Sequence, residues 1–184
     1  IFFSEWGDGH QQMVEGLHSL FEEADAVVTY NGDKYDNKKA RGEFVLAGLT
    51  PPPPITSIDL LKTIKQFGFV MNRLAYIGPL LSVGEKIKNE GFQLWRSVLE
   101  GDAKAQKRME TYCKQDSLLL IDLYDKIKPF IKNHPFLGER HSCGACNGTV
   151  LHKRGYRRTK TMKIERLRCT NCGSWQDGKR EKLS

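Results

Sequence analysis

The chain has 184 residues, 39% of them hydrophobic and 28% charged, with a formal net charge of +7. This length is enough for one packed domain of about 100–150 residues and a small appendage. Its apolar runs are short and its first residues include charged side chains, which argues against a membrane span or an export signal. We therefore expect an intracellular, cytoplasmic protein with no membrane partner.

The positive charge is concentrated in the last quarter of the sequence. Residues 138–184 contain 12 Lys and Arg against 4 Asp and Glu, a net charge of +8, so the rest of the chain carries −1. A basic segment joined to a nearly neutral domain favours a polyanionic partner, most simply nucleic acid. The alternative is a tail that only increases solubility.

The first part of the chain alternates between strand and helix patterns. Residues 1–6 predict a short strand, and apolar residues at three- and four-residue steps predict a helix over 10–23. The apolar run at 26–30 does not alternate, which is typical of a strand buried on both faces. A helix is predicted over 36–46.

Helix patterns dominate the next part. Four prolines at 51–54 predict a stiff, extended connector before a strand over 55–60. Shorter helices are predicted between 61 and 99, and a long helix from about 103 to about 132. Together these elements predict an α/β fold in which helices flank a mixed sheet.

The regular pattern stops at His134-Pro135, and we place a domain boundary at about 133–141. The first domain would then span 1–133. The second, over 138–184, would be a small β-structured metal ribbon with a basic hairpin, for the reasons given next.

Four of the five cysteines form two Cys-x-x-Cys pairs with 22 residues between them: Cys143 with Cys146, and Cys169 with Cys172. This spacing predicts a four-thiolate zinc site, which is structural because no ligand position stays open for water. Gly148 and Gly173 supply the flexibility for the tight turns that such a site needs. The alternative, two disulfides, would leave Cys113 unpaired and needs an oxidising compartment.

The spacer between the two pairs is strongly basic. It contains Lys153, Arg154, Arg157, Arg158, Lys160, Lys163, Arg166 and Arg168, with Tyr156 among them. Folded as a hairpin, these cations can bind phosphates and the tyrosine can stack on a base. Our candidates for nucleic-acid binding are Tyr156, Arg157, Arg158 and Lys160. The alternatives are a merely solvated hairpin or a protein-binding surface.

Two aspartates stand out in the first domain. Asp36 lies just past the end of the strand at 26–30. Asp116 lies on the apolar stripe of the long helix, one turn after Tyr112. That stripe consists of Met109, Tyr112, Cys113, Leu119, Leu120, Leu123, Ile127 and Phe130. A carboxylate on a core-facing stripe is costly unless a partner or a metal compensates its charge. Two aspartates that converge beside a tyrosine indicate a metal site that performs chemistry.

Simpler interpretations of these residues stay open. Asp36 can cap the helix that starts there. Tyr112 can be an aromatic residue at the edge of the core whose hydroxyl finds a partner. Asp116 has the weakest alternative, because an unpaired carboxylate on an apolar stripe is unfavourable.

The sequences Asn-Gly-Asp-Lys-Tyr-Asp at 31–36 and Tyr-Cys-Lys-Gln-Asp at 112–116 resemble the second and third motifs of the DEDD family of 3′–5′ exonucleases, in its tyrosine variant. The resemblance covers about residues 1–132. Tyr35 is a mild departure, since the family usually has phenylalanine there, and Thr111 occupies the position where the histidine variant needs histidine.

The resemblance implies a ribonuclease-H-like fold and a phosphodiesterase that uses two Mg²⁺ or Mn²⁺ ions. Asp116 would bind a metal directly, Asp36 would hold the second site through water, and Tyr112 would orient the attacking water. Asn31 would contact nucleic acid. The family includes polymerase proofreading domains. We expect nucleic acid as the partner, DNA more than RNA, with replication or repair proteins as further partners. A compact nuclease that ends in such a ribbon resembles phage or prokaryotic proteins.

One departure concerns the first motif of that family, an Asp-x-Glu strand that supplies two more carboxylates. No Asp-x-Glu precedes Asn31. We therefore expect the chain to begin at the third strand of the fold, to lack the N-terminal strands, and to be nearly inactive alone. The alternative function is a non-catalytic module that binds nucleic acid or a polymerase on a decayed nuclease fold.

Overall fold

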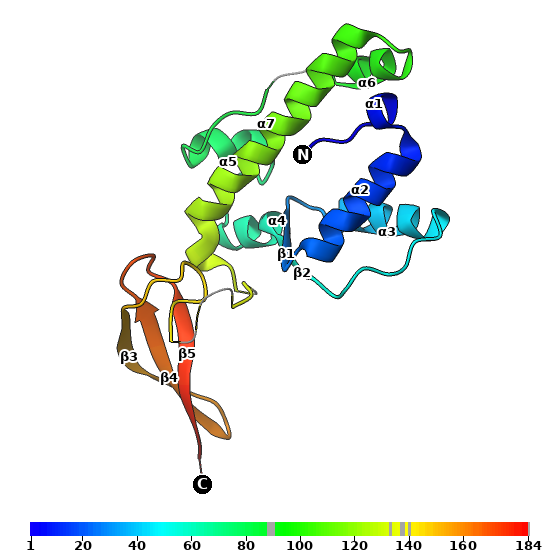
Figure 1. Cartoon of the computed structure of the whole chain (residues 1–184). Helices are drawn as coiled ribbons and strands as arrows, with labels where there is room; N and C mark the ends of the chain where they lie inside the picture. The colour runs from blue at the N-terminus through cyan, green and yellow to red at the C-terminus, as the bar shows by residue number, and fades with distance from the viewer. Residues whose placement is uncertain (88–90, 133, 137–138, 140, 184) are drawn as a thin grey trace. The chain divides into compact units, whose positions relative to one another are not determined.

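The computed structural model describes residues 1–87, 91–132, 134–136, 139 and 141–183. They form two compact units, Ile1–Lys126 and Ile127–Ser184, and the predicted α/β architecture is confirmed (Figure 1). Residues 133, 137, 138 and 140 of the predicted boundary lie outside the described residues. No described helix has the length and apolar composition that crossing a membrane requires.

The N-terminal unit contains a parallel pair of strands and a series of helices. The strands are β1 (Ala26–Thr29) and β2 (Thr56–Asp59). The helices are α1 (Glu5–Asp8), α2 (His10–Glu23), α3 (Asp36–Leu46), α4 (Leu60–Ile64), the 3-10 helix η1 (Lys65–Phe67), α5 (Leu74–Leu80), α6 (Phe92–Leu99) and α7 (Ala103–Ile127). The predicted helices over 10–23 and 36–46 are confirmed residue for residue.

The register of the two strands positions the site. Thr29, the last residue of β1, lies opposite Asp59, the last residue of β2. Because the strands are parallel, the segments that leave their carboxyl ends emerge at the same edge. All four residues of β1 are half-buried, not fully buried as predicted, because within the described residues β1 pairs with β2 alone.

Apolar clusters among the described residues hold this unit together, and two of them join pairs of helices. In the first, α2 and α3 pack through Val14, Phe21, Ala40 and Phe44, and the rings of Phe21 and Phe44 meet edge to face with centroids 5.5 Å apart. In the second, α6 and α7 pack through Leu94, Val98, Ala105 and Met109. The predicted stripe of α7 is buried at Met109, Leu119, Leu123 and Ile127, whereas Phe130 lies beyond the helix and is exposed.

The strand predicted over residues 1–6 is wrong. The side-chain oxygen of Ser4 accepts a hydrogen bond from the N–H of Gly7, and the carboxylate of Asp8 accepts one from the N–H of Ser4. This reciprocal capping begins the short helix α1. Local side-chain bonds therefore decide the conformation here, not the apolar residues at the start of the chain.

The described part of the C-terminal unit contains the 3-10 helix η2 (Lys128–Phe130) and a three-stranded antiparallel sheet. The strands are β3 (Leu151–Arg158), β4 (Met162–Cys169) and β5 (Trp175–Lys182), in the order β3-β4-β5. In the central strand, Ile164 is buried, but most other strand residues are at least partly exposed. So little apolar burial makes a sheet of this size dependent on another source of stability, such as a metal.

Candidate active site and cysteine cluster

Asn31, Asp36 and Asp116 line one pocket of about 690 Å³ in the N-terminal unit. Asp36 is the first residue of α3 and Asp116 lies in the second half of α7. The structure therefore brings together three residues that the sequence singled out. The residue that caps α3 is Tyr35, and it makes no side-chain cap bond, so capping does not account for Asp36.

The loop between β1 and α3 is tightly fixed. Asn31 has a left-handed backbone conformation, with φ 70°, and its N–H donates to Oδ1 of Asp59 at 2.7 Å. Gly32 packs on the side chain of Thr29 so closely that a Cβ atom there would lie 2.5 Å from Cβ of Thr29. This contact excludes any side chain at position 32, and it explains why the motif needs glycine.

Asp33, although acidic and close in sequence, has a structural role. Its carboxylate accepts hydrogen bonds from Lys62, Ser57 and Asn37. The bond from the Lys62 ammonium is the largest cause of a lowered pKa for Asp33. These bonds attach the loop to β2 and α4.

Lys86 is a site residue that the sequence analysis missed. Its ammonium donates to the hydroxyl of Tyr112 at 2.6 Å and lies 2.8 Å from Oδ2 of Asp116. Burial opposes its charge, but the hydrogen bonds to Asp116 and Tyr112 outweigh burial and raise the pKa of Lys86. Asp116 is therefore not an isolated carboxylate: it is ion-paired, and Tyr112 shares the same cation.

The segment that carries Lys86 is held by close backbone packing. The N–H of Val83 donates to the carbonyl of Gly78 on α5, and a Cβ atom at Gly78 would lie 2.5 Å from the carbonyl oxygen of Gly84. A Cβ atom at Gly84 would lie 3.2 Å from the side chain of Leu119 on α7. Small residues at 78 and 84 thus let this segment approach both helices.

Three side-chain oxygens of this pocket are buried and have no hydrogen-bond partner within the described residues. They are Oγ1 of Thr29, Oδ1 of Asn72 and Oδ1 of Asp116, and all three residues line the pocket. Buried oxygens of this kind are costly unless they are satisfied by a ligand. Hard divalent cations such as Mg²⁺ prefer oxygen ligands of these types, so the residues present fit a divalent metal.

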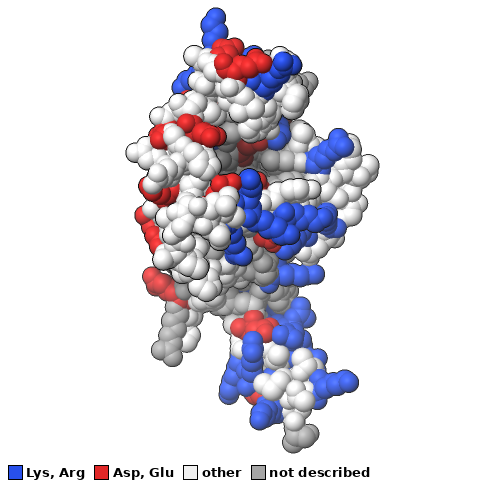
Figure 2. All heavy atoms as spheres, turned by 90° about the vertical axis from the view of Figure 1, so that its right-hand side faces the viewer, with Lys and Arg blue, Asp and Glu red and all other residues white. Residues whose placement is uncertain are grey.

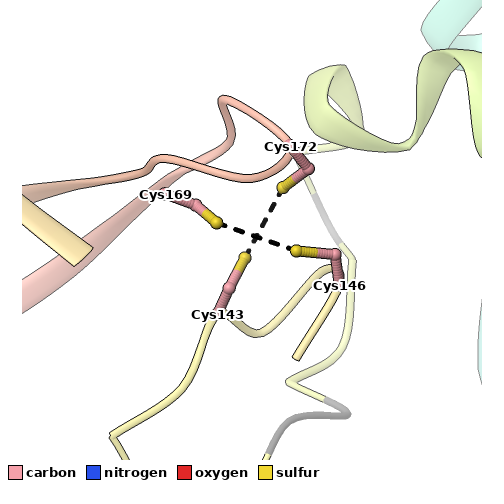
Figure 3. Close-up of side chains that lie close together, drawn as sticks. All are labelled: Cys143, Cys146, Cys169 and Cys172. Carbon is pink, nitrogen blue, oxygen red and sulfur yellow. Dashed lines mark hydrogen bonds between the residues drawn. The ribbon is translucent and has the colours of Figure 1, made fainter. Parts of the chain in front are cut away.

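In the C-terminal unit, the four cysteines of the two pairs converge. Their sulfur atoms all lie within 4.8 Å of one another, and the separations Cys143–Cys172 and Cys146–Cys169 are both 3.7 Å (Figure 3). A tetrahedral zinc site with Zn–S distances of about 2.3 Å has S–S separations of about 3.8 Å. All four are free cysteines, so the disulfide alternative is not realised. The geometry fits zinc.

The two cysteine turns repeat one backbone pattern. The N–H of Cys143 donates to the carbonyl of Gly148, and its carbonyl accepts from the N–H of Asn147; Cys169 makes the equivalent bonds, to Ser174 and from Gly173. The left-handed residues of the turns are Asn147 and Gly173. Gly173 thus has the backbone freedom predicted for it, whereas Gly148 has no positive φ and instead allows close approach, since a Cβ there would lie 3.3 Å from the sulfurs of Cys146 and Cys169.

The environment of the thiols favours partial ionisation. Burial opposes the thiolate of Cys146, but hydrogen bonds from Asn171 and the backbone at Gly148 outweigh it and lower its pKa to about 6. Burial, together with the neighbouring thiols Cys146 and Cys143, raises the pKa of Cys172 to about 11. Thiols this close repel one another once ionised, so a cation is needed to hold all four as thiolates.

The sequence model of the RNase_H superfamily matches residues 2–128. The chain belongs to the RNase_H superfamily. No curated protein and no solved structure matches it. Membership indicates a nuclease-type hydrolase that acts on nucleic acid with divalent metals, and the match covers the pocket with Asp36 and Asp116.

The strands β3, β4 and β5 form a basic ribbon that lies outside the part of the chain matched to the RNase_H superfamily. The cations of this ribbon are not equivalent. Arg157 binds the carboxylate of Asp177 through two atoms, at 3.1 and 2.7 Å. Arg158 and Lys160 have no ion-pair partner within the described residues. Figure 2 shows Lys and Arg side chains, in blue, on the surface of the C-terminal unit, with some Asp and Glu, in red, among them. Tyr156 is exposed, with the ammonium of Lys163 4.1 Å from its ring centre.

Proposed function

We propose that the protein is a metal-dependent 3′–5′ exonuclease that hydrolyses the phosphodiester bonds of nucleic acid, with DNA as the expected substrate. The observation that carries this proposal is the convergence of Asp36 and Asp116 in one pocket, where a buried oxygen of Asp116 has no partner. The superfamily supports the nuclease class, and the two motifs support the exonuclease type.

In this proposal Asp116 and Asp36 bind divalent ions. Oδ1 of Asp116 can bind such an ion because it has no hydrogen-bond partner among the described residues. When bound, two Mg²⁺ or Mn²⁺ ions would activate a water and stabilise the attacking and leaving oxygens. Tyr112 would orient that water through its hydroxyl. Asn31 and Arg73 also line the pocket, where their amide and guanidinium groups can bind the substrate backbone.

We also propose that the four clustered cysteines bind a structural zinc ion. Four thiolates would close the coordination shell and stabilise a sheet that has little apolar core. The ribbon would then present Arg158 and Lys160 to phosphates and Tyr156 to a base.

A degradation assay tests the exonuclease. A single-stranded DNA labelled at its 5′ end is incubated with Mg²⁺ or Mn²⁺ and a form of the protein that also carries the Asp-x-Glu motif, because residues 1–184 alone are expected to be nearly inactive, and 3′ shortening is followed on a gel. We expect Asp116→Asn to reduce the rate by roughly 10²-fold or more, and Tyr112→Phe by less. Asp122→Asn is the matched control, because Asp122 lies on the same helix, is exposed and does not line the pocket. Equal rates for the wild type and Asp116→Asn would refute the metal assignment.

A second candidate is a module that binds nucleic acid without cleaving it. One observation favours it: among the described residues that line the pocket, Asp36 and Asp116 are the only acidic ones, and one is paired with Lys86. A hard cation that prefers about six oxygens is bound weakly by so few charges. Salt-dependent DNA binding without metal-dependent shortening would support this candidate.

A further inference from the structure

The ammonium of Lys86 binds a carboxylate, that of Asp116, for which a divalent ion would compete. Its ammonium lies 2.8 Å from Oδ2 of Asp116, while Oδ1 of the same carboxylate is buried and unpartnered. Both Lys86 and Asp116 line the pocket. One carboxylate thus has one oxygen satisfied by an internal cation and the other left vacant.

We propose that Lys86 is an internal counter-cation of Asp116, and that a divalent metal ion must displace its ammonium before it binds this carboxylate fully. The inference rests on the proposed metal site and describes its regulation. An ammonium and a divalent ion on one carboxylate repel each other, so their binding is mutually exclusive or strongly anticooperative.

The same ammonium also binds the hydroxyl of Tyr112 at 2.6 Å, and it lies 4.9 Å from the centre of that ring. Displacement of Lys86 would therefore release the carboxylate and the phenol together. Tyr112 would become free to hold a water only when the metal is in place. Lys86 is therefore a positioning residue: binding of the metal would displace Lys86, and this displacement would free the hydroxyl of Tyr112.

The segment around Lys86 allows such a movement without disturbing the core. Its anchor points are the backbone contacts of Val83 and Gly84 with Gly78, which precede Lys86 by two or more residues. The side chain of Lys86 is 29% exposed, so its ammonium can turn towards solvent. No rearrangement of α5 or α7 is required.

Mn²⁺ binding, measured by the loss of the free-ion electron paramagnetic resonance signal, tests the inference without using activity. We expect Lys86→Met to bind Mn²⁺ roughly tenfold more tightly than the wild type, and Lys86→Arg to bind like the wild type because it keeps the charge. Adding Asp116→Asn to Lys86→Met should remove the gain. Lys107→Met is the matched control: Lys107 is paired with Glu110 on α7, and neither residue lines the pocket, so affinity should not change.

Melting temperature gives a second readout. In EDTA, Lys86→Met should melt lower than the wild type, since the carboxylate of Asp116 loses its counter-ion, and saturating Mn²⁺ should restore much of the difference. If Lys86→Met does not fold, Lys86→Gln serves the same comparison.

The outcomes separate the two proposals. Mn²⁺ binding that is unchanged or weaker in Lys86→Met, with normal binding by the wild type, would overturn the role of Lys86 and leave the exonuclease proposal standing. No Mn²⁺ binding by the wild type or by any variant would overturn the metal site and this inference together.

Discussion

The carboxylate of Asp59 accepts a 2.7 Å hydrogen bond from the backbone N–H of Asn31, across the carboxyl edge of the parallel strand pair. The same oxygen accepts the N–H of Leu61 at 3.1 Å and so caps α4. Asp59 is only 6% exposed. One buried carboxylate therefore holds both the start of a helix and the loop that leads to Asp36.

We expect Asp59→Ala to lower the free energy of unfolding by about 1–3 kcal/mol, because it removes a cap and leaves the N–H of Asn31 without this partner. It should also weaken Mn²⁺ binding, because the loop that carries Asp36 loses its anchor. Urea unfolding and Mn²⁺ titration measure the two effects.

Asp102→Ala is the matched control for that prediction. Asp102 accepts the N–H of Lys104 at 2.8 Å at the start of α7, but it does not line the pocket. Its removal should cost about 1 kcal/mol of stability and leave Mn²⁺ affinity unchanged. If both variants weaken Mn²⁺ binding equally, Asp59 has no specific role in placing the loop.

Local patterns in the sequence predicted the helices well. The helix over 10–23 follows from apolar spacing, because its buried residues Val14, His18 and Phe21 repeat with the helical period. The helix over 36–46 has a weaker pattern, with only Ala40 and Phe44 buried among its residues. The meeting of Asp36 and Asp116 in one pocket was predicted from motif order and strand context. Residues 1–6 were predicted wrongly because one capping serine outweighs three apolar residues in a segment too short to show a period.

The missed residues depend on tertiary contacts. Lys86 lies in a segment without periodicity, and its place beside Asp116 depends on the close approach of Gly84 to Gly78. Asp59 precedes α4 at a position where an aspartate commonly caps a helix, and it does cap this one. Its second bond, to Asn31, exists only because β1 and β2 are parallel and in this register.

The cysteine cluster predicts one tightly bound zinc ion per chain. Elemental analysis after dialysis should find one zinc in the wild type and far less in Cys169→Ser, because loss of one thiolate opens the site. Chelation should unfold the C-terminal strands, since metal binding stabilises such small sheets. Cys113→Ser is the matched control and should keep its zinc, because Cys113 lies on α7 and outside the cluster. A folded, metal-free ribbon would contradict the prediction.

Tyr30 should make stability depend on pH in the alkaline range. Burial, followed by the charge of Asp59, raises the pKa of Tyr30 from 10.0 to about 12, and its hydroxyl donates to the carbonyl of Asn72 at 2.6 Å. Because the folded-state pKa lies above the unfolded value, this contribution to stability is complete below about pH 10 and is lost as the pH rises towards 12. Urea unfolding at a series of alkaline pH values should show a flatter decline for Tyr30→Phe.

Tyr76→Phe, on α5, controls for the removal of a phenol elsewhere in the same unit. Its stability should fall with rising pH as the wild type does. A decline in Tyr30→Phe as steep as that of the wild type would show that Tyr30 is not responsible for the alkaline loss.

The cations of the ribbon should contribute unequally to nucleic-acid binding. Arg158 and Lys160 have no ion-pair partner within the described residues, whereas the guanidinium of Arg157 is bound at two points by Asp177. We expect the pair of changes Arg158→Ala and Lys160→Ala to lower the salt slope of binding by about two, and adding Arg157→Ala to lower it by less than one more. Fluorescence anisotropy on single strands of different sequence, over a series of salt concentrations, measures both slope and specificity.

The loss of affinity in these variants should be equal on all sequences, because the cations contact phosphates and not base edges. An unchanged slope would mean that the ribbon binds a protein instead.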